Sequence, residues 1–110
     1  MAEQTPKSYF EEKIARKLVD KPETSKAVNS IYEFNITGDT GGVWTVDLTK
    51  EPGTVQAGST GNAKCTVTCA ANDFMNIVSG KMNPQMAFMS GKLKIKGDMG
   101  LAMKLQKVIG

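Results

Sequence analysis

The spacing of apolar residues changes from four to two along the chain, and this change predicts the order of the elements. Near the start, apolar side chains recur every four residues, at Phe10, Ile14 and Leu18. This spacing predicts an amphipathic helix over residues 8–20. Ser8 and Glu11 have the spacing of a capping box at the start of that helix. A second short helix is expected over residues 23–29.

From residue 31 onward, apolar and polar residues alternate, which is typical of strands with one buried face. Two alternating runs flank the Gly-rich segment 38–42 and predict a hairpin. Three further strands are expected, a weaker one over residues 54–59 and stronger ones over residues 64–69 and 92–96.

Polar residues that can cap helices mark the last third of the chain. Asn72 or Asp73 can cap a short helix, and the pair Asn83-Pro84 begins a second one. Both helices are expected to end at a glycine. Asp98 can cap a last helix that runs to residue 108.

Strands clustered between helices at both ends predict an α+β fold, with a five-stranded, mainly antiparallel sheet and helices packed over one face. The length of 110 residues fits a single domain over residues 1–110, of which 1–7 should form a loose tail. Hydrophobic residues make up 40% and charged residues 23%, as in an ordinary globular protein. No apolar run approaches the roughly 20 residues of a transmembrane helix. The start of the chain has no apolar segment of a secretory signal.

The chain contains no histidine. This excludes Ser-His and Cys-His nucleophilic pairs and zinc held by histidine. Glycine loops that bind dinucleotides or phosphates are also missing. Asp73 and Asp98 are the only carboxylates after residue 51, and helix capping explains both. We therefore expect no catalytic residue, no metal site and no cofactor.

Cys65 and Cys69 lie four residues apart on a predicted strand, where their Cα atoms would be roughly 13 Å apart. That distance is too long for a disulfide between them. The simplest interpretation is two small buried side chains on the face of Val67. A reactive thiol would need a neighbour that lowers its pKa, and the sequence offers none. Reduced thiols agree with an intracellular compartment.

Six of the seven methionines lie in the C-terminal part of the chain, between residues 75 and 103. Methionine is flexible, so a wall rich in it suits an apolar ligand of variable shape, although an ordinary core is the alternative. The last helix bears on this choice, because Leu101 and Val108 fall on one side and Met103 nearly opposite. Its second apolar side needs a ligand, a partner or a membrane.

Six lysines and one aspartate follow residue 74. Three of these lysines, Lys92, Lys94 and Lys96, alternate with apolar residues and are expected on the solvated face of the sheet. The alternative to a merely solvated face is attraction to acidic lipid headgroups or to a phosphate of the ligand. Nucleic acid is not expected as a partner, because the net charge is only +3 and no binding motif is present.

Two long segments, Gly80-Lys-Met-Asn-Pro-Gln85 and Gly91-Lys-Leu-Lys-Ile-Lys-Gly-Asp-Met-Gly-Leu-Ala-Met-Lys-Leu-Gln106, closely resemble one known family. Together with Gly42-Val-Trp-Thr-Val-Asp-Leu48, they are similar to the sterol carrier protein type 2 domain. The resemblance implies a soluble carrier with an apolar tunnel between sheet and helices. It also implies fatty acids, fatty acyl-CoA, sterols or phospholipids as ligands.

The resemblance and the neighbouring Met-rich positions indicate which residues hold the lipid. They are Trp44, Phe74, Ile77, Val78, Met82, Gln85, Met86, Phe88, Met89, Leu101, Met103 and Gln106. Gln85 and Gln106 would be polar handles in an otherwise apolar cavity. Basic residues on two amphipathic helices are expected to dock on anionic membranes, namely Lys13, Arg16, Lys17, Lys104 and Lys107.

The leading hypothesis is a monomeric lipid-binding and lipid-transfer protein that is not an enzyme. Burial of ten CH₂ groups would stabilise the complex by roughly 8 kcal/mol before association costs, which is near micromolar affinity. One alternative is a domain that presents substrates to a peroxisomal β-oxidation enzyme, and another is a protein-interaction adaptor. A peroxisomal or cytoplasmic location is expected, although the chain ends in Val-Ile-Gly and not in a peroxisomal tripeptide.

Overall fold

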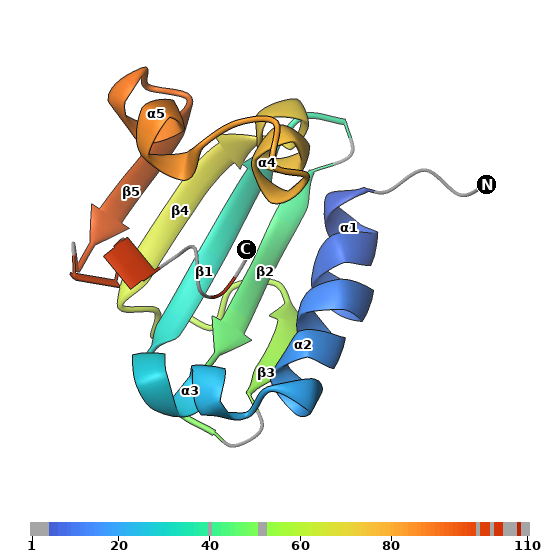
Figure 1. Ribbon diagram of the computed structural model, residues 1–110, viewed down its shortest axis with the longest axis vertical. Helices are drawn as coiled ribbons and strands as arrows, with labels where there is room; N and C mark the ends of the chain where they lie inside the picture. Colours follow the sequence, from blue (N-terminus) through green and yellow to red (C-terminus); the bar gives the residue numbers. More distant parts are fainter. Residues whose placement is uncertain are drawn as a thin grey trace.

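The computed structural model describes residues 5–39, 41–50, 53–98, 100, 101, 103, 104 and 108. These residues form a five-stranded sheet in the order β3-β2-β1-β4-β5 (Figure 1). The strands are β1 (Ile31–Thr37), β2 (Gly42–Asp47), β3 (Thr54–Ala57), β4 (Cys65–Ala70) and β5 (Leu93–Gly97). Neighbouring strands are antiparallel except for β1 and β4, which are parallel. The predicted five-stranded, mainly antiparallel sheet is confirmed.

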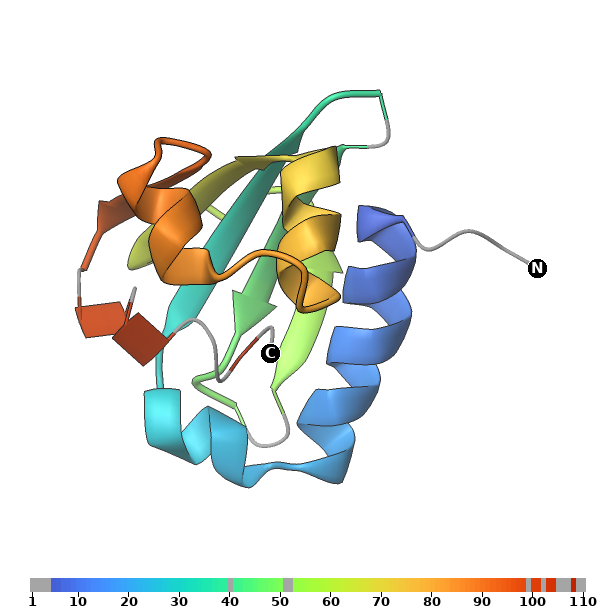
Figure 2. The same cartoon turned by 45° about the horizontal axis from the view of Figure 1, so that its top comes forward.

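The helices occupy one side of this sheet (Figures 1 and 2). They are α1 (Pro6–Ser8), the π-helical segment η1 (Tyr9–Ile14), α2 (Ala15–Asp20), α3 (Glu23–Val28), α4 (Ala71–Val78) and α5 (Pro84–Met89). The first three follow one another without a break, and we call them together the N-terminal helix. It packs against β3, whereas α4 packs against β1 and β4, and α5 packs against β5. No helix of the described residues is long and apolar enough to span a bilayer.

The N-terminal helix begins earlier than predicted. Thr5 is its N-cap: the Thr5 hydroxyl accepts a hydrogen bond from the Ser8 N–H, and the Ser8 hydroxyl accepts one from the Thr5 N–H. The expected capping box of Ser8 with Glu11 is therefore wrong, because Ser8 closes the box that Thr5 opens. The expected loose tail over residues 1–7 is also too long, since Pro6 is buried in the first turn.

The three predicted caps of the last third have different outcomes. Asn83 accepts a hydrogen bond from the N–H of Gln85 at 2.8 Å, and Asp98 accepts one from the N–H of Gly100 at 2.8 Å. Both caps are confirmed. Neither Asn72 nor Asp73 caps α4, because the helix follows β4 directly with Ala70 at its N-cap and no side-chain cap.

The alternation along β4 and β5 sorts side chains as predicted, whereas on β2 Thr45 is buried together with Trp44 and Val46. Cys65, Val67 and Cys69 all lie on the buried face of β4, and both cysteines are free thiols. The three lysines Lys92, Lys94 and Lys96 are exposed. The sheet therefore presents one face to the helices and a basic edge strand to solvent.

Candidate functional site

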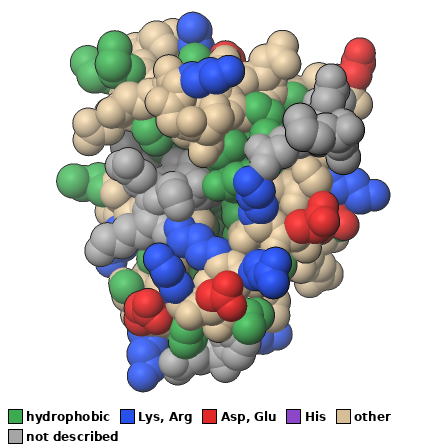
Figure 3. Space-filling model, turned by 45° about the vertical axis from the view of Figure 1, so that its right-hand side comes forward, with side chains coloured by type: hydrophobic (Ala, Val, Ile, Leu, Met, Phe, Trp, Pro, Cys, Tyr) green, Lys and Arg blue, Asp and Glu red, His purple; other side chains and the backbone are tan. Residues whose placement is uncertain are grey.

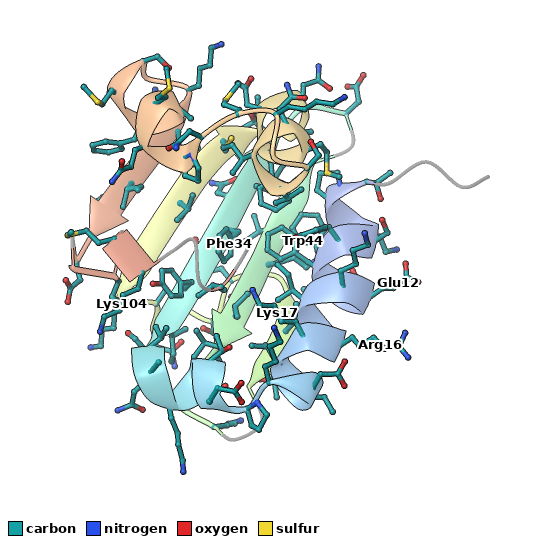
Figure 4. All side chains as sticks on the ribbon, in the orientation of Figure 1. Glu12, Arg16, Lys17, Phe34, Trp44 and Lys104 are labelled. Carbon is teal, nitrogen blue, oxygen red and sulfur yellow. The ribbon has the colours of Figure 1, made fainter. Side chains whose placement is uncertain are left out.

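A stack of aromatic rings joins the N-terminal helix, the sheet and α4. The ring of Phe10 lies between those of Trp44 and Phe74, with centroid distances of 4.9 and 5.0 Å and interplanar angles of 12° and 15°. Phe34 packs against Phe10 at 4.9 Å. Figure 4 shows Trp44 and Phe34 on neighbouring strands in the layer between sheet and helices. Phe10 is fully buried, and its ring is contacted by aromatic side chains from three other elements, β1, β2 and α4.

Trp44 has a polar partner at the edge of this stack. Its indole N–H donates a hydrogen bond to the carboxylate of Glu11, with a nitrogen–oxygen distance of 3.1 Å. Phe10 and Glu11 belong to the π-helical segment η1, and π-helical turns often occur at functional sites. The sequence pattern placed Phe10 on the buried side of a helix, but it did not indicate that the site includes Phe10, Phe34 or Glu11.

The apolar side chains from Phe74 to Met82 change from buried to half-buried. Phe74 and Ile77 are buried, with 1% and 6% of their surface exposed. Val78 and Met82 are half-buried and pack against the core. The structure thus places these four expected lipid-binding residues, with Trp44, on the inner side of the helical layer.

The remaining expected lipid-binding residues do not lie together. Leu101 is buried, whereas Gln85 is exposed and Phe88 is 41% exposed. Met86, Met89 and Met103 are 69%, 85% and 83% exposed. These three methionines do not line the interior in this structure. Gln106 lies outside the described residues.

The last helix has two different sides, as its sequence pattern predicts. Leu101 and Val108 are buried, while Met103 is exposed. The phenol hydroxyl of Tyr32 on β1 donates a hydrogen bond to the backbone carbonyl of Leu101. The first turn after β5 is thereby attached to the centre of the sheet.

The basic residues expected to dock on membranes lie on two sides of the molecule. Arg16 points away from the N-terminal helix, whereas Lys104 lies at the other side of the sheet (Figure 4). Lys13 is also exposed. Lys17 is half-buried, and its burial, with the nearby charge of Lys21, lowers its pKa. Because Arg16 and Lys104 lie on opposite sides of the molecule, the described basic positions do not form one surface. Lys107 lies outside the described residues.

An open hollow of about 330 Å³ lies between α3 and the segment that follows β2. In Figure 1, α3 is at the end of the sheet away from α4 and α5. Its lining residues are Ser25, Lys26, Asn29, Leu48, Thr49 and Lys50. None of them was expected from the sequence to bind a ligand, and no motif at these positions could have indicated it. The lining is mainly polar, which does not suit a lipid chain.

The two thiols are not arranged for chemistry. Burial, with a smaller contribution from Asp98, raises the pKa of Cys65 to about 11, and burial with Asp73 nearby does the same for Cys69. A nucleophilic cysteine needs a lowered pKa and access to its substrate. Within the described ranges, no three Cys, Asp or Glu residues are placed to hold a metal ion.

Comparisons with known proteins extend this description. The family model described as the SCP-2 sterol transfer family matches residues 10–110. The chain is 46% identical over 89 residues to hydroxysteroid dehydrogenase-like protein 2 of Xenopus laevis, covering 80% of this chain and 21% of that protein. It is 44% identical over 99 residues to human sterol carrier protein 2, covering 86% and 18%. The chain thus spans about a fifth of the length of these relatives.

Solved structures agree with the fold. The structure of palmitated SCP2L2 from Aedes aegypti superposes with a TM-score of 0.75 at 28% identity. The superposition covers 96% of this chain and 95% of that one. The similarity therefore includes almost the whole arrangement of strands and helices in both proteins.

Proposed function

Because this chain belongs to the SCP-2 sterol transfer family, we propose that it binds a single lipid between its sheet and its helices and exchanges that lipid with membranes. The proposed ligands are fatty acids, fatty acyl-CoA, sterols and phospholipids. A fatty acid as one of these ligands is supported by the similar structure of SCP2L2 from Aedes aegypti, which is described as palmitated. Two observations support the proposal: the chain belongs to a family of sterol carriers, and apolar side chains fill the layer between its sheet and its helices.

The change from buried to half-buried apolar side chains between Phe74 and Met82 carries the proposal. Phe74 and Ile77 belong to the interior, and Val78 and Met82 continue the apolar surface to half-buried positions. A lipid tail could follow such a path from solvent to the core without crossing polar side chains. The four side chains named along this path carry no charge, so a lipid tail that packs against them would not bury an ionic group.

The proposed tunnel runs past Trp44, Phe74, Ile77, Val78, Met82 and Leu101. The flexible thioether of Met82 would adapt to ligands of different shapes. Gln85 is exposed beyond Met82 and would contact the polar end of the ligand, with Gln106 as the second proposed handle. We propose no catalytic step, since binding and release alone account for these residue types.

Native mass spectrometry of the purified chain, followed by organic extraction, tests this function. We expect a co-purified lipid, or uptake of a fluorescent fatty acid that unlabelled fatty acid displaces. An empty protein that also refuses the probe would show that the apolar layer is a closed core. The adaptor hypothesis would then lead, and a Met103→Glu variant would be expected to lose a protein complex.

A second function, presenting a lipid substrate to an enzyme, is favoured by one observation. The chain matches only 21% of a relative named as hydroxysteroid dehydrogenase-like. If the gene encodes further domains, two proteins can be compared: the full-length product and the same product without this domain. The full-length product should turn over an acyl or steroid substrate faster. Equal rates would contradict substrate presentation. The peroxisomal or cytoplasmic location stays a prediction, which imaging of the full gene product would test.

A further inference from the structure

Exposed apolar side chains gather on α5. Among the residues that the structure describes, five large hydrophobic side chains are exposed: Val19, Met86, Phe88, Met89 and Met103. Three of these five belong to the six residues of α5. Met86 and Met89 are spaced by three residues and so share one face of the helix, while Ala87 is buried against the rest of the protein. The side of α5 that carries Met86 and Met89 thus faces solvent.

Two exposed lysines flank this helix in the chain, within a longer segment that carries only positive charge. The sequence between Asp73 and Asp98 contains four lysines, Lys81, Lys92, Lys94 and Lys96, and no acidic residue. Lys81 precedes α5 and Lys92 follows it, and all four are exposed. Lys94 and Lys96 alternate with the inward-facing Leu93 and Ile95, so they lie on the face of the sheet away from the helices. Figure 3 shows hydrophobic and lysine side chains together at the top of the molecule, where α5 lies in Figure 1. Apolar tips among lysines are complementary to the interface of an anionic bilayer.

We propose that α5, with Met86 and Met89 at its tip and Lys81 and Lys92 beside it, is the element through which this protein contacts an anionic phospholipid bilayer. This inference rests on the proposed lipid-exchange function and names its membrane contact. The methionines insert among the acyl chains just below the headgroups. Each lysine near such a surface increases partitioning by about fivefold.

The size of α5 favours a bilayer over a second protein as the occupant. Six helical residues are about 9 Å long, and α5 lies at one corner of the molecule (Figures 1 and 2). A stable protein interface buries about 800 Å² on each partner, which this helix alone does not offer. A fluid bilayer needs no such matching surface. Small apolar projections can enter it directly.

The N-terminal helix fits an anionic surface less well. Its exposed side mixes Lys13 and Arg16 with the acidic residues Glu11, Glu12 and Asp20. It also packs against β3, at the opposite edge of the sheet from α5. The α5 helix in turn follows Met82 and the end of α4 in the chain. Contact through α5 would therefore bring the proposed tunnel close to the membrane.

Vesicle sedimentation with the full chain tests this inference. The vesicles contain phosphatidylcholine alone or with 30% phosphatidylserine by design, and the variants are Met86→Glu/Met89→Glu, Lys92→Glu and Val19→Glu. Val19 is the matched control, because it is exposed and apolar but lies on α2. We expect the methionine pair to lose tenfold or more in partitioning to anionic vesicles, Lys92→Glu severalfold, and Val19→Glu less than twofold. Circular dichroism checks that each variant is folded.

A fluorescent fatty acid titrated without vesicles separates this inference from the proposed function. The α5 variants should bind the probe within twofold of the wild type. Wild-type chain that binds the probe but no vesicles would overturn the membrane contact and leave the carrier function intact. Vesicle binding unchanged in the methionine pair would also overturn it. So would a concentration-dependent dimer that only the α5 variants abolish. A chain that binds vesicles through α5 but refuses the probe would contradict the carrier function alone.

Discussion

The hydroxyl of Tyr32 on β1 donates a hydrogen bond to the backbone carbonyl of Leu101, a residue 69 positions further along the chain. Both residues are buried, so this bond ties the start of the last helix to the middle of the sheet. Leu101 is also one of the residues that the proposed tunnel would pass. Its strength should therefore govern how readily the last helix separates from the sheet.

Removal of this hydroxyl tests the attachment. In Tyr32→Phe, the carbonyl of Leu101 keeps its burial but loses its donor, which costs about 1–2 kcal/mol of unfolding free energy. Hydrogen exchange of the amides at positions 101, 103 and 104 should accelerate, while that of β4 should change only with global stability. Equal protection of the last helix in both proteins would contradict a special role for this bond.

The ring of Phe10 is expected to be the most costly single truncation in the N-terminal helix. Phe10→Ala removes the ring between Trp44 and Phe74 and should lower the unfolding free energy by about 3–5 kcal/mol. Val19→Ala, an exposed change on the same helix, should cost less than about 0.5 kcal/mol. Urea unfolding measures both. A loss below about 1 kcal/mol for Phe10→Ala would show that the surrounding rings close the cavity.

A larger side chain in the proposed tunnel should exclude the ligand. Ile77 is buried on α4, so Ile77→Trp would fill space that a lipid tail needs and should weaken fatty-acid binding at least tenfold. Met86→Trp introduces the same side chain at an exposed position and should leave the affinity in solution within twofold. Displacement of radiolabelled fatty acid measures both. If Ile77→Trp binds as tightly as the wild type, the ligand does not lie against this side of α4.

Trp44 provides an intrinsic signal, because it is the only tryptophan of the chain. A lipid bound beside the aromatic stack should change the polarity around the indole and shift or quench its emission. Glu11→Gln should keep the fold, since Glu11 is exposed, but should alter the emission of the ligand-free protein through the hydrogen bond to the indole. Emission that is unchanged at saturating ligand would place the lipid away from Trp44.

The buried thiols predict a loss of stability in alkali. Burial raises the pKa of Cys65 from 9.0 to about 11, and that of Cys69 equally. Above pH 9 the unfolded chain releases thiol protons that the folded chain retains, so unfolding becomes easier as the pH rises towards 11. By pH 10 each thiol should cost about 1 kcal/mol of unfolding free energy.

Urea midpoints at pH 8, 9 and 10 under reducing conditions measure this loss. Burial also raises the pKa of Tyr32, so the wild type should lose stability from both kinds of group. The double variant Cys65→Ala/Cys69→Ala should decline less steeply with pH than the wild type. Parallel curves for the two proteins would show that the thiols do not titrate differently on unfolding.

Local patterns were sufficient for most of the secondary structure. Alternation from residue 31 onward depends only on which side chains face the core, and the five predicted strands are all present. The cap at Asn83 was also predictable, because an N-cap acts on amides of the next turn. The cap at Ser8 was not, since Thr5 and Ser8 compete for the same role and the structure selects Thr5.

The order and periodicity of the elements could therefore be predicted from the chain alone, as could a resemblance carried by contiguous residues. The folded arrangement was needed to show that β4 lies parallel to β1, that Glu11 contacts Trp44, and that Met86 and Met89 face solvent. Periodicity is a property of neighbours in the chain. Strand pairing and side-chain burial depend on which distant elements pack together. The same residue type, methionine, can therefore be half-buried at one position and exposed at another.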